Sequence, residues 1–242
     1  GNVSYEQTFG DHNVNGLLLY NQRSYDDGDK VPYRTQGFAG RAAYIYKNRY
    51  IGEFNFGYNG SENFAKGKRY GFFPSIAAGW VMSEEPFMEN VSEFLDKVKF
   101  RMSYGLVGNV RFYIDPDTQK RFGYITTIGD IGQSSTWGNS ATISKDDVHG
   151  LREGEPGVAD LTWETVKKAN IGVEIGFMRM LSLQVDFFHE RREDIFIQRN
   201  NWPTSAGFPS MPWSNYGIVT NKGFDISLDI NKKINKDWFV SA

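Results

Sequence analysis

The sequence predicts an all-β protein: an antiparallel, up-and-down transmembrane β-barrel, of which this chain supplies about ten strands. Two observations lead to this prediction. Apolar and polar residues alternate along most of the chain, as they do in β-strands with one apolar and one polar face. The connections between these segments alternate between short and long, as in barrels with tight turns at one end and long loops at the other. A soluble Greek-key sandwich gives no reason for such an alternation.

The alternation marks segments of similar length along the whole chain. It is clearest at 97–109, where Val98, Phe100 and Met102 are separated by Lys97 and Arg101. The other segments are 2–9, 14–22, 37–47, 50–59, 70–80, 168–175, 181–187, 224–230 and 237–242. We expect the apolar residues of these strands to face lipid, in particular Tyr44, Tyr46, Phe54, Phe56, Val98, Phe100, Met102, Ile171 and Val173. The pattern leaves one alternative open, in which the same residues fill the core of a soluble β-sandwich that binds carbohydrate.

The connections fall into two classes. The short ones lie at 10–13, 47–49, 176–180 and 231–237, and the long ones at 26–35, 60–69, about 108–161 and 199–217. On the short side, residues 83–98 have apolar residues at helical spacing, with Ser83 as an N-cap, and we expect a short helix packed under the barrel rim. An irregular loop is the alternative for this segment.

The composition agrees with a barrel and excludes several classes of protein. The 242 residues are 40% hydrophobic and 16% aromatic, yet the mean hydropathy is −0.50. A net charge of −2 gives no basic field that would attract nucleic acid. No cysteine is present, which excludes disulfides, thiol catalysis and cysteine-based zinc sites. No apolar run approaches the roughly 18 residues of a membrane helix, and residues 1–9 do not resemble a signal peptide.

Four blocks of sequence resemble the SusC/RagA family of TonB-dependent outer-membrane transporters. They occur in the family's order and cover most of residues 36–230, with Asp225 at a position where the family commonly has Glu. The blocks are "GRAAYIYKNRYIGEFNFGYNGSENFAKGKRYGFFPSIAAGWVMSEEPFM" from Gly40, "LDKVKFRMSYGLVGN", "LTWETVKKANIGVEIGFMRMLSLQVDFFHERREDIF" and "NYGIVTNKGFDISLDI".

The resemblance implies a plugged barrel of roughly 22 strands in the outer membrane of a Gram-negative bacterium. This chain would be a middle-to-late portion of that barrel, with the plug domain, the TonB-contacting segment and the barrel ends outside it. The family imports oligosaccharides or peptides with energy delivered through TonB, together with a SusD-like surface lipoprotein. The long loops of this chain would face that partner and the substrate. The resemblance implies no enzymatic activity.

Aromatic residues in the long loops are the candidate substrate-binding residues, because flat rings bury apolar area against sugar rings or peptide side chains. The candidates are Trp202, Trp213, Tyr216, Trp137 and Tyr124. The alternative is that these residues pack the loops together. On the opposite side of the wall, the small Ala77 and Gly79 are expected to let the plug approach, while Lys97, Lys99 and Arg101 face the lumen or plug.

Neither catalysis nor a metal site is expected. Carboxylates such as Asp186, Glu190, Glu193 and Asp194 are the residue type used in glycoside hydrolysis. Beside Arg191 and Arg192, they are expected to form a solvated charge cluster instead. The three histidines lack the spacing of metal ligands, so no cofactor or metal is predicted. Calcium is the one open possibility, at 115–119 or 144–150, although neither segment has full calcium-loop spacing.

Overall fold

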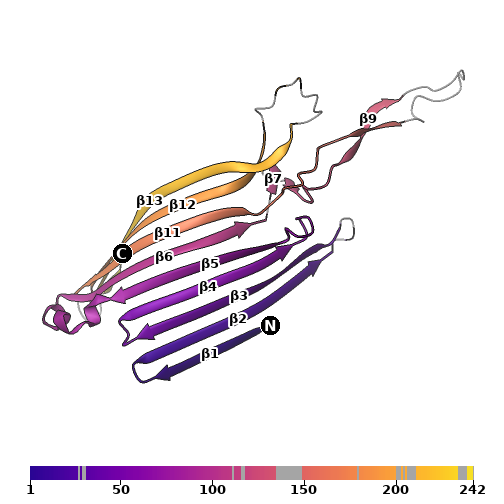
Figure 1. The fold of residues 1–242 in the computed structure, drawn as a ribbon. Coiled ribbons are helices and arrows are strands. Elements are labelled where there is room, and N and C mark those ends of the chain that lie inside the picture. Colours follow the sequence, from indigo (N-terminus) through magenta and orange to yellow (C-terminus); the bar gives the residue numbers. More distant parts are fainter. Residues whose placement is uncertain are drawn as a thin grey trace, which may run out of the picture.

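The computed structural model describes residues 1–26, 28, 31–110, 112–115, 118–134, 149–178, 180–199, 203, 205, 211–233 and 239–241. Ten strands form one antiparallel sheet in the order β1-β2-β3-β4-β5-β6-β11-β12-β13-β14 (Figure 1). Their bounds are Asn2–Phe9, His12–Tyr25, Tyr33–Tyr46, Tyr50–Ser61, Tyr70–Val81, Leu95–Asn109, Glu164–Phe177, Leu181–Gln198, Trp213–Lys233 and Phe239–Ser241. Each strand pairs with its neighbour in sequence except where β6 pairs with β11. The predicted up-and-down sheet of about ten strands is confirmed.

The segment between β6 and β11 forms two hairpins outside the main sheet. β7 (Phe112–Asp115) pairs with β8 (Thr118–Lys120), and β9 (Ile128–Ser134) pairs with β10 (His149–Glu153). Figure 1 shows that these hairpins extend beyond the loop end of the sheet. The expected loop at 108–161 therefore contains strands of its own. The loop expected at 199–217 ends earlier than predicted, because β13 begins at Trp213.

Short and long connections lie at opposite ends of the sheet, as predicted (Figure 1). At the turn end, Lys47 N donates to Asp11 O at 2.8 Å, which ties two neighbouring turns together. Lys47 and Asn48 have φ of 51° and 56°, and Arg49 N donates to Tyr46 O at 2.9 Å. Positive φ at both central residues is typical of a type I′ hairpin, whose twist matches that of the flanking strands.

The helical segment at the turn end differs from the prediction. It consists of two 3-10 helices, η1 (Met82–Glu84) and η2 (Pro86–Val91), and Ser83 lies inside η1 instead of capping a helix. Phe87 is exposed and Met88 is buried, so the apolar residues do not form the expected inward stripe. Pro86 begins η2, at a first-turn position where a helix tolerates proline. Within the described residues, no helix is long and apolar enough to cross a membrane.

The strand register separates the side chains into two faces, because directly opposed residues point to the same side of a sheet. One row runs from Tyr44 through Gly52, Ala78 and Met102 to Ile171. We call this side the apolar face. It carries all nine residues that were predicted to face lipid. Val98 differs from the others on this face, because it is buried, at 7% exposed.

The apolar face is uncovered over most of its area. Phe187, Phe224 and Ile226 are 60%, 64% and 61% exposed. A soluble sandwich would bury such residues under a second sheet. Among the described strands, the only others are the two small hairpins at the loop end, so the sandwich alternative does not fit this fold.

The buried core lies at the loop end of the sheet. Phe64 from the β4–β5 loop, Leu161 and Trp163 from the approach to β11, and Phe196 from β12 form one cluster. Phe64 stacks on Trp163 with ring centroids 5.0 Å apart, and both Phe64 and Leu161 are fully buried. A sheet of one layer has no interior of its own, so the long connections provide the core.

Replacing Leu161 with Ala should therefore destabilise the loop end by about 2–5 kcal/mol, because the vacated space cannot be refilled. Limited proteolysis of the folded, full-length protein would detect faster cleavage within 110–162. Ile125→Ala, at an exposed position of the same segment, is the matched control. Equal cleavage rates in the two variants would contradict a packing role for Leu161.

Candidate functional site

The face opposite the apolar face carries a network of charged side chains, and we call it the polar face. Arg101 on β6 contacts Glu174 on β11 through Nη1 at 3.2 Å and Asp186 on β12 through Nη2 at 2.5 Å. Lys97 Nζ contacts the other oxygen of Glu174 at 2.7 Å, and Gln184 Nε2 donates to Asp186 Oδ2 at 2.9 Å. Lys97 and Arg101 share this face, and the expectation that they face a lumen or plug stays a prediction. Every charge in this group has an opposite partner, so the network balances itself.

Gly172 on β11 allows Arg101 and Asp186 to meet across the strand that separates them. The register places Gly172 directly opposite Arg101 on one side and directly opposite Asp186 on the other. A Cβ atom at this position would collide with Asp186 Oδ1 and with Arg101 Nε. Two long side chains can therefore join over β11 only because the residue beneath them has no side chain.

A smaller group of the same kind lies on β3 and β4. Arg41 Nη2 contacts Glu53 Oε2 at 2.5 Å, and Asn55 Nδ2 donates to Glu53 Oε1 at 2.7 Å. Between the two networks, the polar face carries the small Ala77 and Gly79 of β5. The proposed approach of a plug to these two residues stays a prediction. In the part of this face that the structure describes, the carboxylates Glu53, Glu174 and Asp186 are all bound by basic side chains.

The acidic cluster considered in β12 is paired with basic residues. Glu190 contacts Lys168 at 2.7 Å, while Glu193 contacts Lys167 at 2.5 Å and Arg191 at 2.7 Å. These pairs agree with the expected charge cluster for Glu190 and Glu193. The expectation is wrong for Asp186, which is buried and is bound by Arg101. Within the described residues, no group of His, Asp and Glu could hold a metal ion. The two calcium candidates, 115–119 and 144–150, lie partly or wholly outside the residues whose side chains are described.

Glu85 organises the turn end. It lies between η1 and η2 and accepts hydrogen bonds from Tyr50 Oη at 2.5 Å, Trp80 Nε1 at 3.1 Å and Arg49 Nη1 at 3.3 Å. The hydrogen bond from Tyr50, followed by that from Trp80, holds the pKa of the Glu85 carboxyl below its usual range. Three side chains from β4, β5 and the preceding turn thus converge on one carboxylate.

The predicted substrate-binding aromatic residues do not form one group in the structure. Tyr124 and Trp213 pack against the buried cluster, and Trp213 stacks on Phe196 with centroids 5.2 Å apart. Tyr216 lies under Arg199, whose guanidinium carbon is 4.9 Å from the ring centroid. Trp137 and Trp202 lie outside the described residues. Packing accounts for Tyr124 and Trp213, and substrate contact stays a prediction for all five.

Arg121 and Glu164 were missed by the sequence analysis. The guanidinium of Arg121 lies 3.6 Å from the ring centroid of Tyr33, and its nitrogens donate to Val31 O at 2.6 Å and contact Glu62 at 3.1 Å. It therefore holds the segment after β8 to the β2–β3 loop.

Glu164 accepts hydrogen bonds from Asn109 Nδ2 at 2.8 Å and from Phe196 N at 3.2 Å, and so joins the ends of β6 and β12. Arg121 acts across loops, whereas Glu164 joins the ends of three neighbouring strands. Strand periodicity cannot reveal such contacts.

The known proteins most informative about this chain are large receptors. Over 202 residues, 83% of this chain, it is 32% identical to TonB-dependent receptor P26 of Formosa agariphila. Over 230 residues, 92% of this chain, it is 24% identical to TonB-dependent receptor SusC of Bacteroides thetaiotaomicron. This chain is related to the TonB-dependent receptors. The family resemblance noted in the sequence is thereby confirmed, and the relatives are receptors, not enzymes, as expected. No protein-family model matches the chain.

Solved structures of such receptors share the fold. The RagAB peptide importer in its closed-closed state superposes with a TM-score of 0.78 at 22% identity, over 99% of this chain and 28% of that chain. The siderophore receptor PirA of Pseudomonas aeruginosa gives a TM-score of 0.53 at 13% identity, over 99% of this chain and 40% of that chain. The chain spans about a fifth to a quarter of the length of the curated TonB-dependent receptors it matches.

The crossing over Gly172 can be tested with a double-mutant cycle. Gly172→Ala and Arg101→Met should each destabilise the barrel by about 1–3 kcal/mol, because each leaves Asp186 without its cation. The double variant should cost clearly less than the sum, since both changes remove the same contact. Urea unfolding of the full-length protein in lipid vesicles measures all three values. Gly52→Ala, where a Cβ atom meets open space, is the control. If the costs of the two single variants simply add in the double variant, Gly172 and Arg101 do not serve the same contact.

The Glu85 contacts predict a pH dependence. Because the folded pKa lies below the unfolded one, the carboxylate stabilises the protein above about pH 4.3 and loses this effect as the pH falls through the folded pKa. Glu85→Gln should therefore be less stable than the parent at neutral pH, and the difference should shrink as the pH falls below about 4.3. Urea unfolding followed by tryptophan fluorescence measures this difference. The exposed Glu84→Gln should show no such trend.

Proposed function

We propose that this chain forms part of the wall of a TonB-dependent importer in the outer membrane. The imported substrate is an oligosaccharide or a peptide, and a SusD-like lipoprotein is the partner at the loop end. The observation that supports this proposal best is the sheet itself: one layer with an uncovered apolar face, a self-balanced ionic polar face and all long loops at one end. In a lipid barrel these become the outer surface, the lumen and the extracellular side.

The apolar face has the dimensions of a membrane-spanning belt. On β3, β4 and β5 its aromatic residues recur at the two ends of segments of nine residues: 38–46, 50–58 and 72–80. A strand tilted in the membrane needs about 9–11 residues to cross it. Phe38, Tyr58 and Phe72 mark the loop side of the belt, and Tyr46, Tyr50 and Trp80 mark the turn side. Aromatic girdles at both interfaces are a general feature of membrane barrels.

The ion pairs of the polar face and the aromatic residues of the loop end support the proposal that these parts form the lumen wall and the mouth of the barrel. Ion pairs that join three neighbouring strands suit a wall that faces water or a polar plug. At the loop end, the candidate aromatic residues would contact substrate or the lipoprotein; they are Tyr216, Trp202, Trp213, Trp137 and Tyr124. The RagAB peptide importer supports peptides as a substrate class. Oligosaccharides are proposed beside them because the family resemblance seen in the sequence implies them.

The proposal is tested by uptake in cells. A strain lacking the full-length protein should fail to accumulate labelled oligosaccharides or peptides, and the gene should restore uptake only when TonB is present. A library of fluorescent oligosaccharides and peptides identifies the substrate class. Recovery of the full-length protein in the soluble fraction, or uptake that is independent of TonB, would contradict the proposal.

The apolar belt gives a second test. Ile76→Arg, in the middle of the belt at a residue that is 58% exposed, should destabilise the barrel in lipid vesicles by about 2–4 kcal/mol. Ala77→Arg places the same charge one residue further along β5, on the polar face of the sheet, and should cost much less. Urea unfolding in vesicles compares the two variants. Equal costs would argue against a lipid-facing apolar face.

A further inference from the structure

The connection between β5 and β6 folds back over the apolar face at the turn end. Tyr50 and Trp80 are directly opposed on this face, and both donate hydrogen bonds to Glu85, which lies between η1 and η2. Val98 on the apolar face of β6 is buried, and η1 contacts β6. Met88 in η2 is buried as well. One side of this connection therefore packs on the sheet.

The other side of the same connection exposes apolar side chains. Phe87, Val91 and Phe94 are 61%, 39% and 51% exposed. The backbone nitrogen of Phe94 donates to Val91 O, and the backbone nitrogen of Met178 donates to Phe94 O, both at 3.0 Å. Met178 is exposed too. We call Val91, Phe94 and Met178 the turn-end patch. Apolar side chains gathered on an exposed surface mark a place of interaction.

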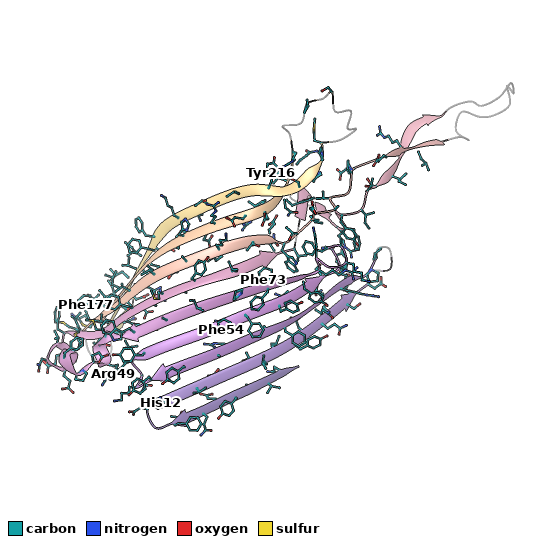
Figure 2. All side chains as sticks on the ribbon, viewed as in Figure 1. His12, Arg49, Phe54, Phe73, Phe177 and Tyr216 are labelled. Atoms are coloured by element: carbon teal, nitrogen blue, oxygen red, sulfur yellow. The ribbon has the colours of Figure 1, made fainter. Side chains whose placement is uncertain are left out.

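The turn-end patch continues the apolar face. Phe94 packs edge-on against Phe177, with ring centroids 5.8 Å apart, and Figure 2 labels Phe177 at this end of the sheet. Phe177 is directly opposed to Leu181, and Leu181 is directly opposed to Ile230, in a row of the apolar face. The patch therefore extends the proposed lipid-facing surface beyond the ends of the strands.

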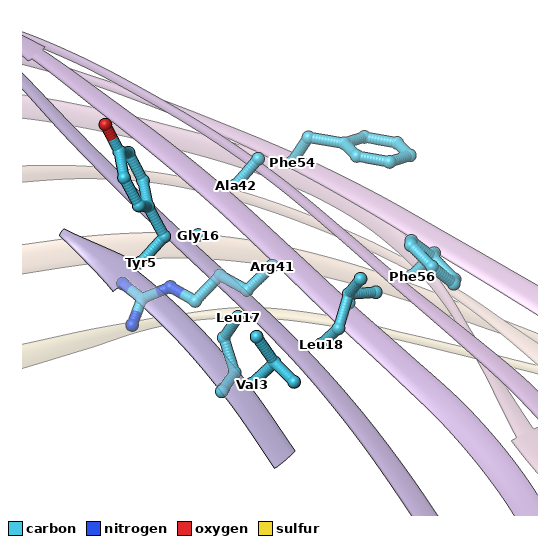
Figure 3. A pocket seen from close by; sticks show the side chains of 10 residues that line it. Val3, Tyr5, Gly16, Leu17, Leu18, Arg41, Ala42, Phe54 and Phe56 are labelled. Carbon is cyan, nitrogen blue, oxygen red and sulfur yellow. The ribbon is translucent and has the colours of Figure 1, made fainter.

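The apolar face of β1–β4 provides a comparison. It has a groove of about 330 Å³, floored by Gly16 and Ala42, beside which Leu18 and Phe54 are exposed (Figure 3). In the proposed barrel, lipid would cover such side chains directly. Where the connection between β5 and β6 packs on the same face, it takes the place of lipid.

The polar ends of Tyr50 and Trp80 indicate the level at which the connection lies. At a membrane interface, tyrosine and tryptophan keep their rings in the apolar region and their polar ends towards the headgroups. Here the Oη of Tyr50 and the Nε1 of Trp80 donate to Glu85 at 2.5 Å and 3.1 Å. The connection therefore occupies the layer that headgroups would occupy, and its patch borders the acyl chains.

The charge of the connection is acidic throughout. Residues 82–96 contain five carboxylates and neither lysine nor arginine. Three of these carboxylates are exposed: Glu84, Glu89 and Glu93. Carboxylates in the headgroup layer repel anionic lipids and attract the ammonium group of an aminophospholipid. The charge therefore favours a zwitterionic lipid with an amine headgroup.

We propose that residues 82–94 form an interfacial anchor in the leaflet at the turn end. The turn-end patch lies among the acyl chains, and Glu89 and Glu93 face the ammonium groups of phosphatidylethanolamine. This inference depends on the proposed membrane location. A basic protein is the other occupant that the charge would suit. Continuity with the apolar face favours lipid, because Phe94 packs on Phe177 at the edge of the lipid-facing surface.

Spin labels on single cysteines test the anchor, since this chain has no cysteine of its own. The full-length protein, labelled at Phe94→Cys, is placed in vesicles of phosphatidylcholine and phosphatidylethanolamine. Collisions with oxygen, which dissolves in lipid, should be several times more frequent than collisions with a neutral, water-soluble nickel chelate. Asp11→Cys, at an exposed position in a turn at the same end, is the matched control and should favour the chelate.

Lipid charge gives a second measurement. When phosphatidylglycerol replaces phosphatidylethanolamine, the chelate should reach the label at Phe94→Cys more often, because the exposed carboxylates withdraw from an anionic surface. Glu89→Gln with Glu93→Gln should remove this difference between the vesicles. Glu6→Gln removes an exposed carboxylate from the polar face of β1 and should leave the difference unchanged.

A label at Phe94→Cys that meets the chelate as readily as the label at Asp11→Cys would overturn the anchor, and is the result expected if a protein covers this surface. Equal accessibility in the two kinds of vesicle would overturn the assigned headgroup. Each variant is checked for a folded barrel by its heat-dependent migration on gels.

A label at Ile76→Cys, in the middle of the belt, separates this inference from the proposed function. If that label also meets the chelate more often than oxygen, the proposed membrane location is wrong and the anchor with it. If the label at Ile76→Cys favours oxygen and the label at Phe94→Cys does not, the anchor alone is wrong.

Discussion

Side chains that alternate between two faces of an extended strand are the constraint on which the rest of this molecule depends. A slip of one residue in any strand would exchange the two faces, so that Asn55 would replace Phe54 or Phe56 on the apolar face. The register is continuous through the middle of the sheet. Its irregularities lie near strand ends, at Gly176 and between Arg192 and Phe196. Ten strands can therefore present one apolar and one polar surface without any second layer.

Residues without large side chains shape both surfaces. On the polar face, Gly172 lets Arg101 and Asp186 join across an intervening strand, so that β6, β11 and β12 are tied by side chains as well as by backbone hydrogen bonds. On the apolar face, Gly16 and Ala42 open a groove between larger neighbours. In a wall one residue thick, the absence of a side chain is the simplest way to make space for another group.

The long connections supply what the sheet lacks. A single layer cannot bury a hydrophobic core, and the fully buried side chains Phe64 and Leu161 belong to connections at the loop end. Arg121 and Glu164 fasten the bases of these connections to the strands. Some of the candidate substrate-binding aromatic residues take part in this packing. Trp213, for example, stacks on Phe196.

The sequence by itself determined the strands of the main sheet, the two faces and the end at which the long loops lie, because alternation with a period of two is a local property. It also carried the family resemblance. Tertiary structure alone decided which distant residues meet. The crossing over Gly172, the convergence on Glu85 and the start of β13 at Trp213 depend on register and on loops folding back, which no local pattern encodes. The helical spacing after Ser83 was misleading for the same reason, since contacts to neighbouring strands, such as those of Glu85 with Tyr50 and Trp80, override a weak local preference.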